Sequence, residues 1–217
     1  MQRQIAIEAW VRARMANEAT GHDWFHVVRV RDCALGLATR EGSCNAEIVA
    51  TAALLHDIPD RKLHPNPAEA MCEIEALLES VGFDFQERSH IAAIITGVSF
   101  RGANIATPMD TLEGAVVQDA DRLDALGAIG IARCFAYGGR KGRPLYDPEV
   151  PPTLHTDAEA YFNDGGASLN HFYEKLFLMK DRMLTESGKK AAAERHRFLQ
   201  EYVERFLSEW SGADLPR

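Results

Sequence analysis

The sequence predicts an all-α fold, a compact bundle of roughly seven to nine helices around one core with no significant sheet. Apolar residues recur three and four positions apart along most of the 217 residues, which is the period of an amphipathic helix. No run alternates apolar and polar residues between turn signals, as a half-buried strand would. With 46% hydrophobic and 26% charged residues, the composition is that of a globular protein.

The expected helices follow one another along the chain, each from its own apolar stripe. In order, the stripes are Ile7, Trp10, Val11 and Met15; Val27, Val30, Ala34 and Leu37; residues 47–57; Ile91, Ile94, Ile95 and Val98; Gly114, Val117, Asp121, Ala125 and Ala128; Leu169, Phe172, Tyr173 and Leu176; and Phe198, Tyr202, Val203 and Phe206. Residues rich in Pro, Gly and polar side chains interrupt the stripes at 59–67, 100–108 and about 138–166. A loop as long as the last one is more often functional than idle.

These stripes predict a single helical domain over residues 1–217. Its core should span about 20–135, and C-terminal helices at about 166–210 should pack on that core after the long loop at about 138–166. No apolar run approaches the roughly 18 residues of a membrane span, and the first residues lack the apolar stretch of a secretory signal. We therefore expect a cytoplasmic protein that binds no membrane.

Charge and cysteine usage exclude further classes of function. The formal net charge is −8, whereas proteins that grip a nucleic-acid backbone usually carry a basic surface. We expect no nucleic-acid partner. The four cysteines form no Cys-x-x-Cys pair, so their spacing indicates neither a zinc finger nor a disulfide framework.

Two histidines and two aspartates predict a metal site: His26, His56, Asp57 and Asp121. Adjacent residues within a helix point about 100° apart, so His56 and Asp57 would not normally reach one ion. Pro59, however, disfavours helical backbone at Ile58. The helix over 47–57 should therefore end at His56 and Asp57, where both side chains can turn toward one point. The C-terminus of a helix also attracts cations.

Asp121 lies on the stripe of mostly small residues from Gly114 to Ala128. Small residues permit close approach of other helices, and a carboxylate buried there is costly unless it is paired or bound to metal. Two imidazoles and two carboxylates suit a divalent ion such as Mn²⁺, Mg²⁺, Fe²⁺, Co²⁺ or Zn²⁺. Water completing the shell of such an ion can be activated as a nucleophile.

The order His26, His56-Asp57 and Asp121 resembles the HD-domain superfamily of metal-dependent phosphohydrolases. The segments LLHDIPD (54–60) and DADRLDALGAIGIARCFAYGG (119–139) are similar to its small bacterial branch of predicted HD hydrolases. This resemblance extends from His22 to about Phe206. It implies a phosphodiesterase-like helical fold, a divalent metal bound by the four residues, and hydrolysis of phosphoester or phosphoanhydride bonds, commonly in nucleotides. Because the additional histidines of binuclear members are missing, we expect one ion.

The resemblance also suggests roles for residues around the expected metal. Asp60, four residues after His56, is similar to an acidic residue that orients or deprotonates the attacking water in some HD hydrolases. The alternative is a solvated loop carboxylate. Cations that could bind substrate phosphate are Arg29, Lys62, Arg122, Arg140, Lys141 and Lys175, with Arg61 and Arg143 close to them in the sequence. For Arg122 the alternative is a pairing with Asp119 or Asp124, and for Arg29 it is likewise an ion pair. For the other cations it is an ordinary surface charge.

The relatives of this branch imply cleavage of the nucleoside triphosphate pyrophosphohydrolase type. The alternatives are a nucleotide phosphodiesterase or nucleotidase, a non-catalytic metal-dependent module that binds or senses nucleotides, and a helical scaffold without metal. In the catalytic interpretations the partner is a small-molecule phosphate ester or nucleotide, and the protein is a monomer or a homodimer.

Overall fold

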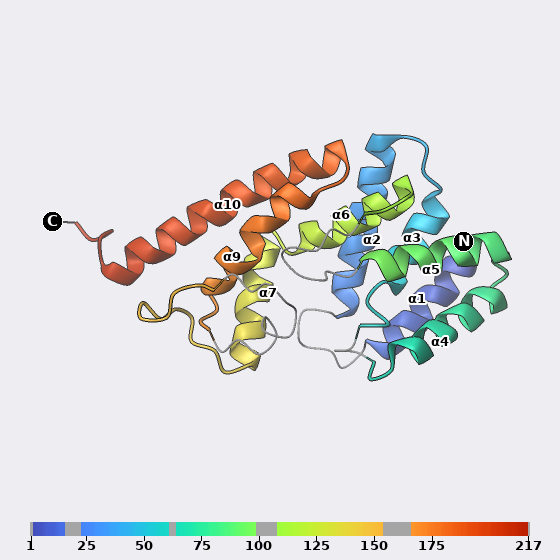
Figure 1. Ribbon diagram of the computed structural model, residues 1–217, viewed down its shortest axis with the longest axis horizontal. Coiled ribbons are helices and arrows are strands. Elements are labelled where there is room, and N and C mark those ends of the chain that lie inside the picture. Colours follow the sequence, from blue (N-terminus) through green and yellow to red (C-terminus); the bar gives the residue numbers. More distant parts are fainter. Residues whose placement is uncertain (1, 16–22, 61–63, 99–107, 154–165, 217) are drawn as a thin grey trace. The chain divides into compact units, whose positions relative to one another are not determined.

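All regular secondary structure in the described part of the chain is helical, which confirms the predicted all-α class (Figure 1). The computed structural model describes residues 2–15, 23–60, 64–98, 108–153 and 166–216, and these ranges contain no strand. The helices are α1 (Gln2–Arg14), α2 (Trp24–Glu41), α3 (Ala46–Leu55), α4 (Pro67–Ser80), α5 (Phe85–Val98), α6 (Leu112–Asp124), α7 (Gly127–Arg140), α9 (Asn170–Glu174), the 3₁₀ helix η1 (Leu176–Arg182) and α10 (Glu186–Ser211).

Side-chain caps set where several helices begin. Asp23 precedes α2, and its carboxylate accepts a hydrogen bond from the backbone N–H of His26 at 2.8 Å. Asn45 and Asn66 accept backbone N–H groups in the same way at the starts of α3 and α4. A cap satisfies donors that the first helical turn leaves unpaired. The cap on α2 thereby holds the turn that carries His26.

The described residues divide into two compact units. The first contains α1 to α5, residues 108–121 and residues 184–188, and the second contains residues 122–153, 166–183 and 189–216. The expectation of one domain over 1–217, with C-terminal helices packed on the core, stays a prediction.

Helix α3 is the centre of the first unit. All its residues from Ile48 to Leu55 are buried, and it packs against α1, α2 and α5. The stripes predicted for α1, α2 and α5 are buried in the structure, except for Trp10, which is half-buried. A helix that is apolar on all sides is stable only inside a core. The burial of α3 therefore places its C-terminal end, with His56 and Asp57, in the interior.

The second unit departs from the predicted helices at three points. The stripe from Gly114 to Ala128 is not one helix, because α6 ends at Asp124 and the left-handed φ of +67° at Gly127 redirects the chain into α7. Helix α7 continues to Arg140, past the predicted loop start at about 138. The stripe around Phe172 forms the short helix α9 and then η1, because the backbone at Lys175 (φ −140°, ψ −54°) leaves the α-helical region.

Helix α10 buries Val203 as predicted, but the rest of its buried face differs from the predicted stripe. Phe198 is 46% exposed, whereas Ala192, Leu199 and Val203 are buried. These three residues are spaced by seven and four positions, so they form one stripe, and Phe198 lies about 100° away from it. In the part of the chain that the structure describes, no helix combines the length and the apolar character needed to cross a membrane.

Candidate metal centre

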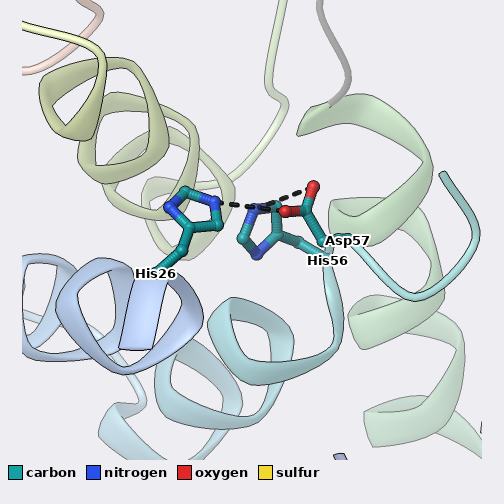
Figure 2. A group of neighbouring side chains, drawn as sticks. All are labelled: His26, His56 and Asp57. Carbon is teal, nitrogen blue, oxygen red and sulfur yellow. Dashed lines mark ion pairs between the residues drawn. The ribbon is translucent and has the colours of Figure 1, made fainter. Parts of the chain in front are cut away.

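The four predicted ligands come from three helices of the first unit. His26 lies in the first turn of α2, His56 caps the C-terminus of α3 with Asp57 next to it, and Asp121 lies in the last turn of α6. Helix α3 ends at Leu55 and a turn follows at 56–59, close to where Pro59 predicted it. Because the chain turns here, His56 and Asp57 face the same point, as Figure 2 shows.

The ligand atoms of the four side chains lie close together. The Nε2 atom of His26 is 3.2 Å from Oδ2 of Asp57 and 3.6 Å from Oδ1 of Asp121. The Nε2 atom of His56 is 3.4 Å from Oδ1 of Asp57 and 3.6 Å from the same oxygen of Asp121. Atoms bound to one ion at about 2.1 Å are roughly 3–3.5 Å apart in tetrahedral or octahedral geometry. These distances fit a single divalent ion held by His26, His56 and Asp57, with Asp121 as the predicted fourth ligand.

The surroundings of His56 support this assignment. Its Nδ1 lies 2.7 Å from the carbonyl oxygen of Ala53, so the ring can donate its Nδ1–H there and present Nε2 to the site. This is how proteins usually orient a histidine ligand. Within the described part of the chain, the Nε2 atom is buried and has no hydrogen-bond partner, although it lies close to both carboxylates. Such an atom is costly unless something fills its place, and a metal ion would do so.

The site is buried on one side and open on the other. His26, His56 and Asp57 are all buried and form a group that could hold a metal ion, whereas the side chain of Asp121 is 28% exposed. Water or a substrate can therefore approach from the side of Asp121. A site with protein ligands and an open position is the arrangement that metal-dependent hydrolysis requires.

Without a bound ion, the charges of the site compensate one another. Burial lowers the pKa of His56, but Asp57 and Asp121 outweigh this effect and raise it to about 9. Burial raises the pKa of Asp121, and the imidazoles of His56 and His26 lower it below its ordinary value. The carboxylates thus attract a positive charge into the site. A divalent ion would supply that charge and displace the proton from the imidazole.

Asp60 is the residue predicted to act on the attacking water. It is half-buried and follows the turn that carries His56 and Asp57. Its backbone N–H donates to the carbonyl of Asp57 at 3.0 Å, and its own carbonyl accepts from the N–H of His64 at 2.8 Å. Hydrogen bonds to Asp57 and His64 therefore fix the backbone on both sides of Asp60. Its catalytic role stays a prediction.

The predicted phosphate-binding cations fall into three groups. Arg29 is half-buried on α2, one turn after His26 and on the same side of the helix. Lys62, together with Arg61, lies outside the described residues. The others belong to the second unit and are Arg122, Arg140, Lys141 and Lys175, with the nearby Arg143.

Within the second unit, these cations differ in exposure. Arg122 is buried, and its guanidinium donates a hydrogen bond to the carbonyl of Arg182. Arg140 and Lys141 are exposed at the C-terminus of α7. Lys175 follows α9 directly and is half-buried. Their contact with a substrate stays a prediction.

One buried residue near the site was not assigned a role by sequence reasoning. Asp119 is fully buried on α6, two residues before Asp121. Its position in the segment DADRLD suggested only a pairing partner for Arg122. Its contacts, described below, involve residues 184 and 185, which no local sequence pattern relates to it.

An all-α fold with two histidines and two carboxylates converging from three helices defines the class of an HD-type metal site. The HD domain family matches residues 24–126, a range that contains all four ligand positions. The Bacillus subtilis protein YpgQ is 36% identical over 209 residues, covering 96% of this chain and 94% of its own. This chain therefore belongs to the HD-domain family.

Solved structures of similar proteins also support membership of the HD-domain family. An HD-superfamily hydrolase from Bacillus thuringiensis is 40% identical, with 97% of each chain covered and a TM-score of 0.76. A protein from Lactobacillus plantarum is 38% identical, covering 97% of this chain and 98% of its own, with a TM-score of 0.83. YpgQ has been crystallised in complex with ADP, and that structure matches with a TM-score of 0.75, 36% identity and coverage of 95% of this chain and 96% of its own.

Proposed function

We propose that this protein is a metal-dependent phosphohydrolase acting on nucleotides, with cleavage of the nucleoside triphosphate pyrophosphohydrolase type. The observation that carries the proposal is that each of two buried imidazoles lies 3.2–3.6 Å from both carboxylates, of which Asp121 is the more exposed. A divalent ion bound there lowers the pKa of water and so supplies a nucleophile at neutral pH. The complex of YpgQ with ADP supports a nucleotide as the ligand.

The residues of this chain would divide the remaining tasks. Asp60, held by its backbone next to the His56-Asp57 turn, would accept a proton from the attacking water. Attack on the α-phosphorus would break the bond between the α- and β-phosphates, so that a nucleoside triphosphate and water give a monophosphate and pyrophosphate. Cations such as Arg29 would neutralise charge that develops on the phosphoryl oxygens.

A substrate screen tests this proposal. The purified protein is incubated with nucleoside mono-, di- and triphosphates, cyclic nucleotides and an aryl phosphate, each with Mn²⁺, Mg²⁺ or Co²⁺. We expect monophosphate and pyrophosphate from a triphosphate, and no turnover with Asp121→Asn. The control is Asp32→Asn, which changes a carboxylate that is 61% exposed on the helix of His26 and should leave turnover unchanged.

The products separate the alternatives. Release of inorganic phosphate from a monophosphate would identify a nucleotidase, and opening of a cyclic nucleotide would identify a phosphodiesterase. Nucleotide binding without turnover in any metal would identify a sensing module. Each of these results contradicts the pyrophosphohydrolase proposal.

A further inference from the structure

The buried carboxylate of Asp119 holds a segment from a distant part of the chain. Its Oδ1 accepts a hydrogen bond from the N–H of Leu184 at 2.9 Å. Its Oδ2 accepts the N–H of Thr185 at 2.8 Å and the hydroxyl of Thr185 at 2.7 Å. Asp119 is 0% exposed. Hydrogen bonds to a charged acceptor are about twice as strong as neutral ones, so these donors stabilise the buried carboxylate in place.

The partner segment is itself ordered by the same threonine. The hydroxyl of Thr185 also accepts the N–H of Gly188 at 3.0 Å, which is the N-cap pattern for α10. Gly188 leaves no room for a larger residue, because a Cβ there would lie 2.3 Å from Oδ2 of Asp119. The carboxylate thus sits against the first turn of α10, where the helix dipole favours a negative charge.

Residues 184–188, here called the brace, also contact the helix of His26. The N–H of Ser187 donates to Oε1 of Glu41 at 2.6 Å, and Glu41 is the last residue of α2. The brace, α2 and the part of α6 up to Asp121 belong to the first unit. It therefore links the helix that carries His26 to the helix that carries Asp121, although it lies far from both in the sequence.

Asp119 and Asp121 are two positions apart on α6, so their side chains point about 200° apart around the helix. One face of α6 is bound to the brace, and the opposite face presents Asp121 to His26 and His56. We propose that Asp119 is a positioning residue for the metal ligand Asp121, and that it acts by fixing the rotation of α6 against the brace. This inference rests on the metal site of the proposed function.

The test is the affinity for Mn²⁺ alone, measured by calorimetry and by the paramagnetic resonance of bound Mn²⁺, alongside the melting temperature of the metal-free protein. Three variants probe the contact. Asp119→Asn removes the charge, and Thr185→Val removes the hydroxyl while keeping the shape. Thr185→Ser keeps the hydroxyl. A fourth, Leu199→Ala, removes a buried side chain of α10 and serves as a control for lost stability.

We expect Asp119→Asn and Thr185→Val to raise the Kd for Mn²⁺ by about 10-fold to 100-fold, the range of effects seen when the support that orients a metal ligand is lost. Thr185→Ser should bind as the wild type does. Leu199→Ala should melt at a lower temperature and bind Mn²⁺ with unchanged affinity. If Asp119→Asn does not fold, the inference is tested by comparing the Kd for Mn²⁺ of Thr185→Val with that of Thr185→Ser.

Two results would overturn the inference while leaving the metal site intact. One is unchanged affinity in Thr185→Val and Asp119→Asn. The other is an equal loss of affinity in Leu199→Ala, since that would reflect general stability. A wild type that binds no Mn²⁺ would instead refute the metal site itself, and the inference with it.

Discussion

Oδ2 of Asp57 lies 3.2 Å from Nε2 of His26, although the two residues belong to different helical segments. This contact joins the end of α3 to the start of α2, and Asp121 adds α6 to the same point. A site built from three helices ties them together when an ion binds. Stability, activity and metal content should therefore change together.

Metal should stabilise the folded protein. An ion that binds the native state at 100 times its Kd adds about 2.7 kcal/mol, which for a chain of this size corresponds to roughly 5–10 °C in Tm. We expect EDTA to lower Tm by that amount and Mn²⁺ to restore it. In His56→Ala the response to metal should vanish, and in Asp32→Asn it should persist. Identical melting curves with and without metal would refute the site.

Asp60 should contribute to turnover and leave metal binding alone. If it accepts the proton of the attacking water, Asp60→Asn should lower kcat by roughly 10²–10⁴, with metal content equal to that of the wild type. The matched control is Asp110→Asn, which alters an exposed loop carboxylate and should have full activity. Loss of metal in Asp60→Asn would identify Asp60 as a metal ligand. Full activity would show that Asp60 has no catalytic role.

The exposed cations at the end of α7 should favour substrates with several phosphates. A charged hydrogen bond contributes about 1.5–3 kcal/mol, so replacing both Arg140 and Lys141 by Ala should reduce kcat/KM for a triphosphate at least tenfold. The loss for an aryl phosphate should be much smaller. Higher salt should also lower kcat/KM more for the triphosphate than for the aryl phosphate, because screening affects the more highly charged substrate most.

A pair of exposed arginines on α10, Arg197 and Arg205, provides a control with the same change in charge. Replacing both arginines by Ala should change kcat/KM for the triphosphate and for the aryl phosphate by the same factor. Equal losses for the two substrates in the Arg140 and Lys141 variant would show that these cations do not bind phosphate.

Alkaline pH should destabilise the protein partly through Cys134. Burial raises the pKa of this thiol to about 12 against the lowering influence of Arg143 and Lys175, and its Sγ donates to the carbonyl of Ser168 at 3.3 Å. The unfolded chain loses this proton near pH 9. The contribution of the thiol is therefore complete below about pH 9 and is lost as pH rises toward about 12.

The measurement is the free energy of unfolding in urea between pH 8 and pH 10. The wild type should lose up to about 1.4 kcal/mol more per pH unit above pH 9 than Cys134→Ala does. In the native state at pH 8, a thiol reagent should modify the exposed Cys72 well before Cys134. Parallel pH profiles for the two proteins would contradict a raised pKa at Cys134.

Local physics explains which parts of the fold the sequence predicts. Helical periodicity predicts the buried stripes of α2 and α5, because each stripe is a property of a few consecutive residues, whereas α4 was not among the predicted helices. The end of α3 at His56 follows from Pro59 in the same way. Periodicity fails where a single residue redirects the chain, as at Gly127, and where two apolar faces compete, as at Phe198 and Leu199 on α10.

The sequence by itself predicted the all-α class, the four candidate ligands and the turn that lets neighbouring His56 and Asp57 face one point. Only the tertiary structure decided that each imidazole lies 3.2–3.6 Å from both carboxylates, that the side chain of Asp121 is partly exposed, and that Asp119 accepts hydrogen bonds from Leu184 and Thr185. The reason is physical. A helix is specified by interactions between residues three and four apart, whereas the distance between two helices depends on how all their buried side chains pack together.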